Sequence, residues 1–184
     1  MMLEEEKQYL LQLARKTIEE KLNGKEINLD EEKVPESLKV KKGCFVTLTS
    51  NGNLRGCIGH LLPVQELYKD VIENALSASF QDPRFPPLEK MEFKALHIEI
   101  SVLDVPEKLN FNGETDLIEK LVKDKPGVIL KKGMNQATFL PQVWDDLPKP
   151  EEFLTHLCMK AGLEPFQWKQ DVEIETYGVE KFEE

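Results

Sequence analysis

The pair Asn51-Gly52, set between two β-rich runs, constrains the fold of this chain more than any other sequence feature. Both residues tolerate the positive φ angles that a tight hairpin turn requires, and residues 44–50 and 53–59 on either side are rich in β-forming side chains. We therefore predict an antiparallel hairpin. A two-residue turn gives the pairs Ser50 with Asn53, Leu48 with Arg55, and Val46 with Cys57.

The rest of the sequence predicts helices and further strands without a repeated strand–helix–strand rhythm. Apolar residues recur at helical spacing in residues 3–22, 63–80, 116–123 and 151–161. Alternating or short apolar runs predict strands at residues 96–102, 127–130, 137–140 and 172–179. This order favours an α+β fold, with a mostly antiparallel sheet and flanking helices, over a doubly wound fold. A length of 184 residues suggests a single domain that spans residues 1–184.

The charge balance argues against a nucleic-acid binder. The chain carries 24 Lys and Arg against 34 Asp and Glu, which gives a formal net charge of −10, whereas binding to phosphates requires a clustered positive face. Two short lysine clusters keep a small basic patch open as an alternative: Lys39, Lys41 and Lys42, then Lys131 and Lys132. Arginine is rare and therefore more informative, because its planar fork suits carboxylate and phosphate recognition. The three arginines are Arg15, Arg55 and Arg84.

Three sequence features lead us to expect a cytoplasmic protein. The N-terminus is acidic where a signal peptide would be basic. The chain has three Cys, an odd and low count that fits a reducing compartment better than a disulfide framework. No apolar run approaches the roughly 18 residues of a membrane span, so we expect no membrane association.

The segment from Leu54 to Gly59 is the first candidate site. Arg55 and Cys57 share one face of the predicted strand, and a guanidinium beside a thiol stabilises the thiolate. Gly56 and Gly59 interrupt the strand and would leave backbone amides unshielded for an anion. The segment therefore predicts an anion cradle or part of a cysteine-nucleophile site.

Ordinary packing is the competing interpretation of the same segment. In the simple register Cys57 faces Val46 and becomes a small core residue. Arg55 then pairs with a carboxylate at the rim of the sheet. Ligand binding by Arg55 and the glycine backbone needs no nucleophile, so we favour it over covalent catalysis by Cys57.

A proline-stiffened loop, residues 81–87, is the second candidate. Proline fixes where Asp82 and Arg84 point, and a rigid loop that carries these two side chains with Phe85 suits carboxylate or phosphate recognition. The alternative is a proline-locked helix exit with Asp82 as a cap. Gln142 is a third candidate for the binding site. Trp144, two residues further along the chain, could stack on a planar ligand, but the pattern favours a place in the core for it.

Most familiar catalytic motifs are absent from the sequence. It contains no Walker A loop, GxGxxG, HExxH or GxSxG. His60, His97 and His156 are far apart, and the cysteines show no CxxC spacing. Nothing in the pattern points to a metal or a cofactor.

Four segments resemble a known family. Residues 54–59, Leu-Arg-Gly-Cys-Ile-Gly, are identical to the six-residue signature of the AMMECR domain family. Residues 82–85, 139–143 and 160–163 resemble further family segments in the same order. The resemblance covers nearly the whole chain, and on it the chain is identified as a member of that family.

The resemblance implies more about fold than about activity. It implies an α+β fold with two unequal lobes and a cleft between them near the signature. Microbial members resemble protein A of a gene system that also contains a Memo-type protein and a radical-SAM protein, which are therefore expected partners. Family proposals include translation-related or RNA-modification processes. No cofactor and no proven catalytic residue come with the resemblance.

Three functions follow as hypotheses. The leading one is binding of a small or partner-presented anionic group around residues 54–59 and 82–85. The second is a cysteine-dependent enzyme that uses Cys57, with Arg55 as thiolate stabiliser. The third is a non-enzymatic module for nucleic acid or protein. The first depends on one geometric expectation, that the two segments meet in space.

Overall fold

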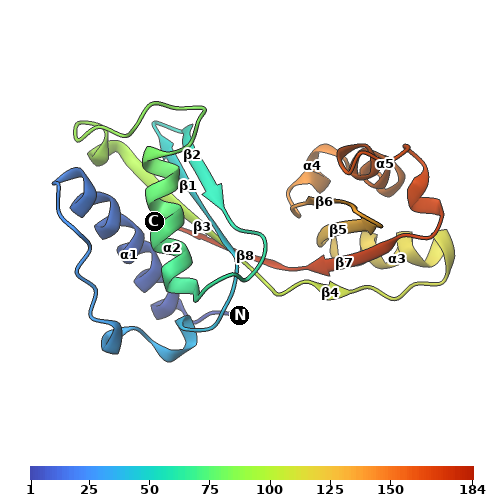
Figure 1. The fold of residues 1–184 in the computed structure, drawn as a ribbon, viewed down its shortest axis with the longest axis horizontal. Helices are drawn as coiled ribbons and strands as arrows, with labels where there is room; N and C mark the ends of the chain where they lie inside the picture. The colour runs from blue at the N-terminus through green and yellow to red at the C-terminus, as the bar shows by residue number, and fades with distance from the viewer. The chain divides into compact units, whose positions relative to one another are not determined.

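The computed structural model describes residues 1–184 and divides the chain into two compact units. Unit 1 contains Met1–Val105 and Glu180–Glu184, and unit 2 contains Pro106–Val179. Each unit holds its own four-stranded sheet (Figure 1). The α+β class and the antiparallel pairing that the sequence predicts are confirmed, as are two unequal parts. The cleft between lobes and the single-domain assignment stay predictions.

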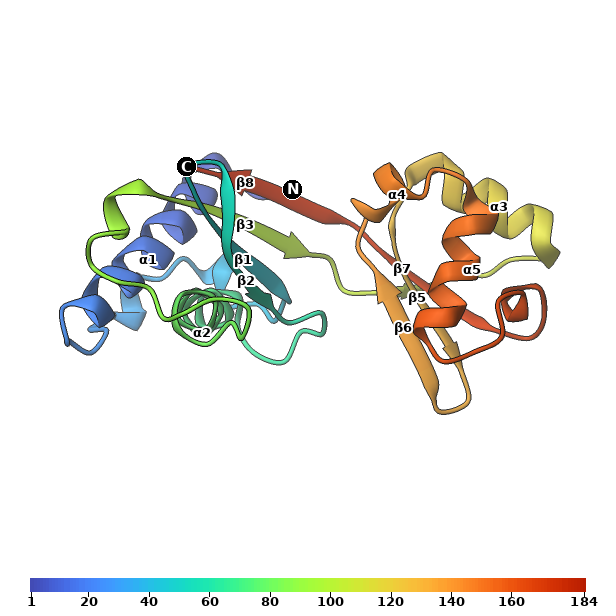
Figure 2. The same cartoon turned by 90° about the horizontal axis from the view of Figure 1, so that it is seen from above.

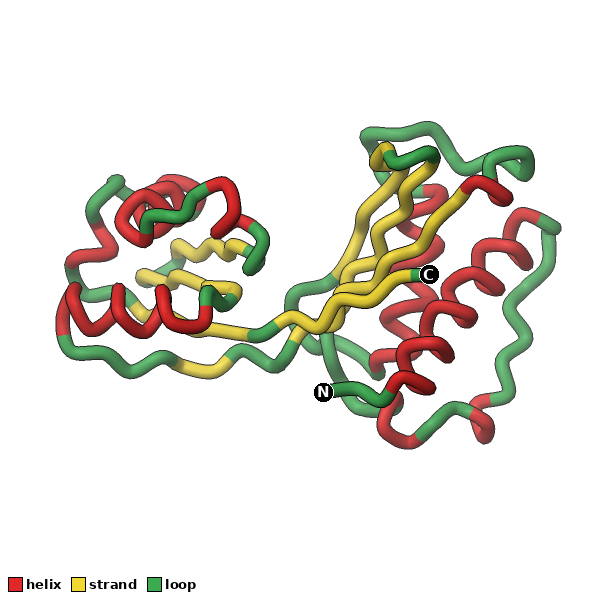
Figure 3. The backbone as a smooth tube through the Cα atoms, turned by 180° about the vertical axis from the view of Figure 1, so that it is seen from behind, coloured by secondary structure: helices red, strands yellow, loops and turns green.

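Unit 1 is built from two helices and a sheet with the strand order β2-β1-β3-β8. The strands are β1 (Cys44–Ser50), β2 (Asn53–Gly59), β3 (Leu96–Leu103) and β8 (Val179–Glu183), and the helices are α1 (Glu4–Leu22) and α2 (Leu67–Phe80). The two helices lie side by side in Figure 1, and Figure 3 shows them on one side of the strands.

The core of unit 1 lies between these helices and one face of the sheet. Alternate residues of β1 are buried there, namely Cys44, Val46 and Leu48. The apolar stripes of α1 and α2 supply the opposite side of the core. Short 3₁₀ turns at Glu31–Lys33 and Glu36–Leu38 form part of the connection between α1 and β1.

Unit 2 has the strand order β4-β7-β5-β6. Its strands are β4 (Glu107–Lys108), β5 (Gly127–Lys132), β6 (Asn135–Phe139) and β7 (Glu173–Tyr177), and its helices are α3 (Gly113–Asp124), α4 (Val143–Asp146) and α5 (Pro150–Lys160). Figure 2 shows these elements from above. Trp144 is buried and stacks on Phe153 with a centroid distance of 3.8 Å, which confirms the core role expected for it.

Two element boundaries differ from the sequence predictions. Helix α2 begins at Leu67 rather than at Pro63, because Glu66 forms a bridge with Lys41 and the Leu67 N–H donates to the Val40 carbonyl, which keeps this stretch extended. The strand predicted at residues 172–179 corresponds to β7 in unit 2, and a further strand that was not predicted, β8, follows it in the sheet of unit 1.

The predicted hairpin register is correct only next to the turn. Ser50 pairs with Asn53 as expected, but a β-bulge follows, so that Leu48 pairs with Gly56 and Thr47 with Cys57. Cys57 therefore does not face Val46 and is not part of the core, which corrects the packing interpretation. The residue that the bulge inserts is Arg55.

Candidate functional site

Strand β2 is an edge strand of its sheet, and the loop that follows α2 covers that edge. The Cys57 N–H donates to Asp82 Oδ2 over 2.9 Å, and Arg84 Nη2 donates to the Cys57 carbonyl over 3.2 Å. These two side chains thus take the place of a neighbouring strand, which is one way proteins protect a sheet edge. We call the Asp82 and Arg84 side chains, bonded to the Cys57 backbone, the Asp82–Arg84 clamp.

The two clamp residues are also bonded to one another. Asp82 Oδ1 accepts from Arg84 Nε at 2.9 Å and from the Arg84 backbone N–H at 3.1 Å, while Oδ2 accepts from Arg84 Nη2 at 2.7 Å. The hydrogen bond from Arg84, which outweighs the opposing effect of burial, holds the pKa of the Asp82 carboxyl well below its usual range. The Asp82 side chain is only 2% exposed, whereas that of Arg84 is 53% exposed. The clamp therefore has a buried anionic end and an open cationic end.

Arg55 is held by a different carboxylate. Its Nε and Nη2 donate to the two Glu92 oxygens at 2.7 and 3.0 Å, and Nη2 also donates to the Pro86 carbonyl at 2.9 Å. Its Nη1 is buried without a partner. The rim carboxylate that the packing interpretation expected is thus present. The Arg55 fork is occupied by Glu92, which leaves the predicted role as stabiliser of a Cys57 thiolate without support.

Phe85 connects the two arginines. Its ring centroid lies 5.5 Å from Arg84 Cζ and 5.9 Å from Arg55 Cζ, within the range of cation–π attraction. The Phe85 N–H donates to the Asp82 carbonyl at 3.1 Å, which closes a turn around Pro83. The predicted loop and the predicted strand segment are therefore brought together in unit 1.

The Cys57 thiol is half-buried on the face of the sheet opposite the helices. Its sulfur accepts a hydrogen bond from Thr47 Oγ1 at 3.3 Å. Thr47 carries no motif that could have marked it in the sequence, because its proximity to Cys57 depends on the bulge-shifted register.

The two glycines of the segment pack against the protein's own backbone. A Cβ at Gly56 would lie 2.1 Å from the Ala78 carbonyl oxygen of α2, and a Cβ at Gly59 would lie 2.3 Å from the Cys44 carbonyl oxygen. The close approach that glycine permits here is therefore explained by helix and strand packing. A binding role for Gly56 and Gly59 stays a prediction.

Gln142 precedes α4 as its N-cap residue and is exposed. It belongs to unit 2, whereas the clamp belongs to unit 1. Its participation in the binding site stays a prediction.

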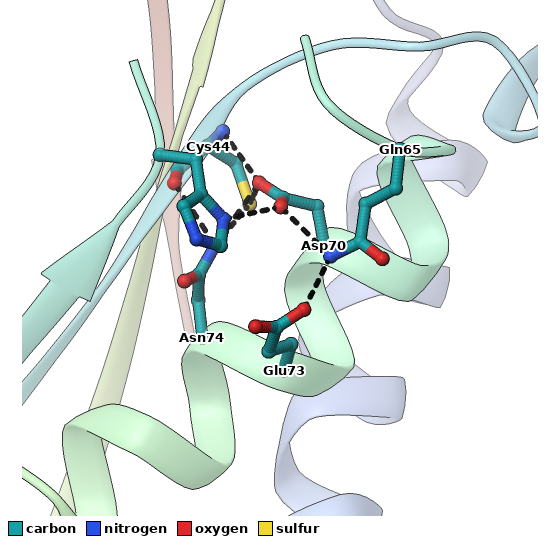
Figure 4. A network of polar contacts seen from close by, with 6 residues as sticks. Cys44, Gln65, Asp70, Glu73 and Asn74 are labelled. Atoms are coloured by element: carbon teal, nitrogen blue, oxygen red, sulfur yellow. Dashed lines mark hydrogen bonds and ion pairs between the residues drawn. The ribbon is translucent and has the colours of Figure 1, made fainter. Parts of the chain in front are cut away.

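A second polar cluster surrounds Asp70 on α2, and no motif in the sequence marks it (Figure 4). Asp70 and Asn74 are fully buried, although both are polar. Their spacing from Leu67, at three and seven residues, places them on the buried face of α2. That spacing is the sequence signal that could have revealed them.

No group of three or more His, Cys, Asp or Glu side chains in the structure is arranged to hold a metal ion. No helix is both long and apolar enough to cross a membrane.

Comparisons with known proteins agree on one family. The family model described as AMMECR1 matches residues 11–182 and so spans both units. A protein of Methanosarcina barkeri is 38% identical over 195 residues, which cover 100% of this chain and 93% of that protein. A protein of Methanopyrus kandleri is 41% identical over 191 residues, with 98% and 89% covered. The crystal structure of an uncharacterized protein from Pyrococcus horikoshii superposes with a TM-score of 0.83 at 37% identity, covering 100% of this chain and 93% of that chain. The chain belongs to the AMMECR1 family, as its signature segment predicts.

Proposed function

We propose that this protein binds an oxyanionic group, a carboxylate or a phosphate, at the open end of the Asp82–Arg84 clamp. One observation carries the proposal: the Arg84 guanidinium is fixed by a buried carboxylate and yet is half exposed. Arg84 Nε and Nη2 donate the hydrogen bonds to Asp82 and to the Cys57 carbonyl. Nη1 donates none of these bonds, so in this proposal it is the atom that donates to the ligand. A guanidinium held in one orientation loses less conformational entropy when it binds an anion than a mobile one does.

The surroundings of Arg84 support this choice of residue over Arg55. The Arg55 side chain is 11% exposed and its charge is balanced by Glu92 through two hydrogen bonds. In this proposal Arg55 holds the loop in place through Glu92 and the Pro86 carbonyl, and Arg84 is the residue that meets the ligand. The Phe85 ring, within cation–π range of both, limits the directions in which the Arg84 guanidinium turns.

Titration with inorganic phosphate and with acetate tests the proposal and distinguishes the two oxyanions. Because Asp82 cancels part of the Arg84 charge, we expect weak binding, with a Kd on the order of 1 mM. Arg84→Gln should weaken binding by about fivefold or more. Lys90→Gln is the matched control, because it removes an exposed cation from the same connection between α2 and β3. Equal affinity of Arg84→Gln and Lys90→Gln for both anions would contradict the proposal.

A partner protein is one source of such a group. The family resemblance suggests a Memo-type or a radical-SAM protein as the partner that presents it. Co-purification of each with the wild-type chain and with Arg84→Gln tests this part separately. Loss of capture in Arg84→Gln supports presentation of the anionic group by the partner, and unchanged capture contradicts it.

A cysteine-dependent reaction at Cys57 is the second candidate. The observation that favours it is a half-buried thiol that accepts a hydrogen bond from Thr47 and whose backbone is held by the Asp82–Arg84 clamp. Iodoacetamide labelling over a range of pH tests it. A Cys57 that reacts no faster than an unfolded-state thiol contradicts this candidate.

The nucleic-acid hypothesis receives less support. Of the two lysine clusters, Lys39 pairs with Glu36, Lys42 with Asp104, and Lys131 with Glu175. Most of that positive charge is therefore already neutralised within the protein, so we do not propose nucleic-acid binding.

A further inference from the structure

The polar cluster around Asp70 is an acid–base arrangement that the proposed oxyanion site does not use. Asp70 Oδ1 lies 2.7 Å from His60 Nδ1 and 3.1 Å from Gln65 Nε2. Asp70 Oδ2 accepts from the Cys44 N–H and from Asn74 Nδ2, both at 3.0 Å, and from the Cys44 thiol at 3.2 Å. Figure 4 shows these groups converging on the carboxylate.

His60 is the one basic side chain that contacts this carboxylate. The Asp70 side chain is fully buried, and a buried carboxylate is costly unless it is paired and hydrogen bonded. Its other donors are neutral: two amides, a backbone N–H and a thiol. Burial raises the pKa of the Cys44 thiol well above its usual value, so this thiol stays protonated and donates to Asp70.

The contact with Asp70 also selects the tautomer of His60. A carboxylate accepts, so a neutral His60 imidazole carries its proton on Nδ1 and donates it to Asp70. The lone pair is then on Nε2. The hydrogen bond from Nδ1 to Asp70 holds the ring in place and leaves Nε2 free to accept a proton, as in the histidine–aspartate pairs of hydrolases.

The imidazole is held on a fixed backbone and is open to solvent. The His60 side chain is 36% exposed. Its backbone N–H donates to the Cys44 carbonyl at 3.0 Å. Gly43 packs against it so closely that a Cβ there would lie 2.3 Å from the His60 carbonyl oxygen. A group that is both positioned and accessible meets the geometric requirement for proton transfer to a ligand.

The residues near His60 indicate which ligands suit it. Leu62 and Val64 follow it in the chain and are both exposed, which offers apolar contact area. The imidazole bonds the Asp70 carboxylate, and Gln65 Nε2 links that carboxylate to a second one, Glu73, at 3.1 and 2.6 Å. This environment disfavours an anionic ligand.

We propose that His60 Nε2 is a proton acceptor for an uncharged, mainly apolar ligand that carries a protic or ester group, with Asp70 as the positioning residue. This inference is independent of the oxyanion site, because it uses none of the residues of the Asp82–Arg84 clamp.

Hydrolysis of p-nitrophenyl acetate provides a direct assay. His60 Nε2 removes a proton from water as the water oxygen bonds to the ester carbonyl carbon. The bond from that carbon to the nitrophenolate oxygen then breaks, and the imidazolium returns the proton to the leaving group. The products are acetic acid and p-nitrophenol, and the imidazole is regenerated.

The comparison is made in a Cys57→Ser background, so that acylation of that thiol does not contribute. We expect His60→Gln to lower the protein-dependent rate by about tenfold or more. His97→Gln is the matched control, because His97 Nε2 also contacts a carboxylate, Glu183 at 3.2 Å, but in an exposed pair. The control should stay within about twofold of the parent. Equal rates for His60→Gln and His97→Gln would overturn the proposal.

Two further measurements separate proton transfer from a purely structural role. Nitrogen-15 NMR of the unsubstituted protein should show neutral His60 as the Nδ1–H tautomer, and an Nε2–H tautomer would overturn the assignment. Asp70→Asn, with folding checked by its amide spectrum, should lose that tautomer preference together with most of the rate. A folded Asp70→Asn protein that keeps both also overturns the proposal.

Discussion

Replacement of Asp82 by alanine should destabilise unit 1, because this carboxylate holds the edge strand. Asp82 accepts four hydrogen bonds, one from the Cys57 N–H at 2.9 Å and three from Arg84 at 2.7 to 3.1 Å. Alanine removes all four acceptor contacts and leaves both partners in place. The loop that carries Arg84 then loses its bond to the Cys57 N–H.

The magnitude follows from the exposure of the two partners. Leaving the partly buried Cys57 N–H without an acceptor costs about 1–3 kcal/mol. The half-exposed Arg84 is rehydrated, so its lost ion pair adds only about 1 kcal/mol. Together these contributions predict a loss of about 2–4 kcal/mol for Asp82→Ala. Asp82→Asn keeps an acceptor for the N–H and should lose about half as much.

The assay must follow unit 1 specifically. Both tryptophans, Trp144 and Trp168, lie in unit 2, so their fluorescence does not report on the mutated part. Amide hydrogen exchange of β1 and β2, measured in increasing concentrations of urea, reports on the stability of unit 1. Asp104→Asn is the matched control, because that carboxylate is 65% exposed in its pair with Lys42 and should contribute less than about 0.5 kcal/mol. An Asp82→Ala protein as stable as the Asp104→Asn control would refute the reasoning.

Three further outcomes follow from the structure of unit 1. Gly56→Ala should destabilise the fold by at least about 2 kcal/mol in urea denaturation, because its Cβ would overlap the Ala78 carbonyl oxygen; an unchanged midpoint contradicts this packing. Because the pKa of Asp82 is lowered in the folded state, its contribution to stability is complete above about pH 4, the unfolded-state value, and is lost as the pH falls through the lower folded-state value. The stabilities of wild type and Asp82→Asn, measured during acid titration, should therefore converge at low pH. A constant difference between the two curves contradicts the assignment. Iodoacetamide should modify Cys57 before Cys44, because Cys57 is half-buried whereas Cys44 is buried and burial raises the pKa of its thiol. Mass spectrometry of the labelled protein checks the order, and modification of Cys44 first contradicts the burial of these thiols.

Local patterns in the sequence were sufficient to predict most elements of the fold. The Asn51-Gly52 turn has the positive φ angles that its residues favour, 51° and 77°. Helix α2 ends at Phe80, before the proline-rich loop, as predicted. Gly162 adopts a positive φ of 74° after α5, a conformation that glycine favours at the end of a helix. These features depend on residues close together in the chain.

The errors in the fold occur where distant contacts decide the structure. The bulge at Arg55 accompanies ion pairing with Glu92, which lies 37 residues away and cannot be recognised from a period of two. Strand β8 is charged and lacks a clear alternation, and it is defined by its place beside β3. The sequence therefore predicted a strand that stopped before it.

The candidate site shows the same division. The proline-rich loop and the Leu54–Gly59 segment were recognisable, because their compositions restrict the backbone. The partner of Arg55 was not recognisable, because Glu92 lies 37 residues away and is one of 34 acidic residues. Only the structure distinguishes Arg84, with an exposed guanidinium, from the enclosed Arg55.

The most direct test of the central claim is to map phosphate binding on the amide spectrum of the intact chain. If the Asp82–Arg84 clamp is the binding site, the shifts should be largest at the amides of Cys57, Arg84 and Phe85. Shifts that leave those three amides unchanged and concentrate instead in the groove of about 510 Å³ in unit 2, beside Lys131 and Lys132, would contradict the account.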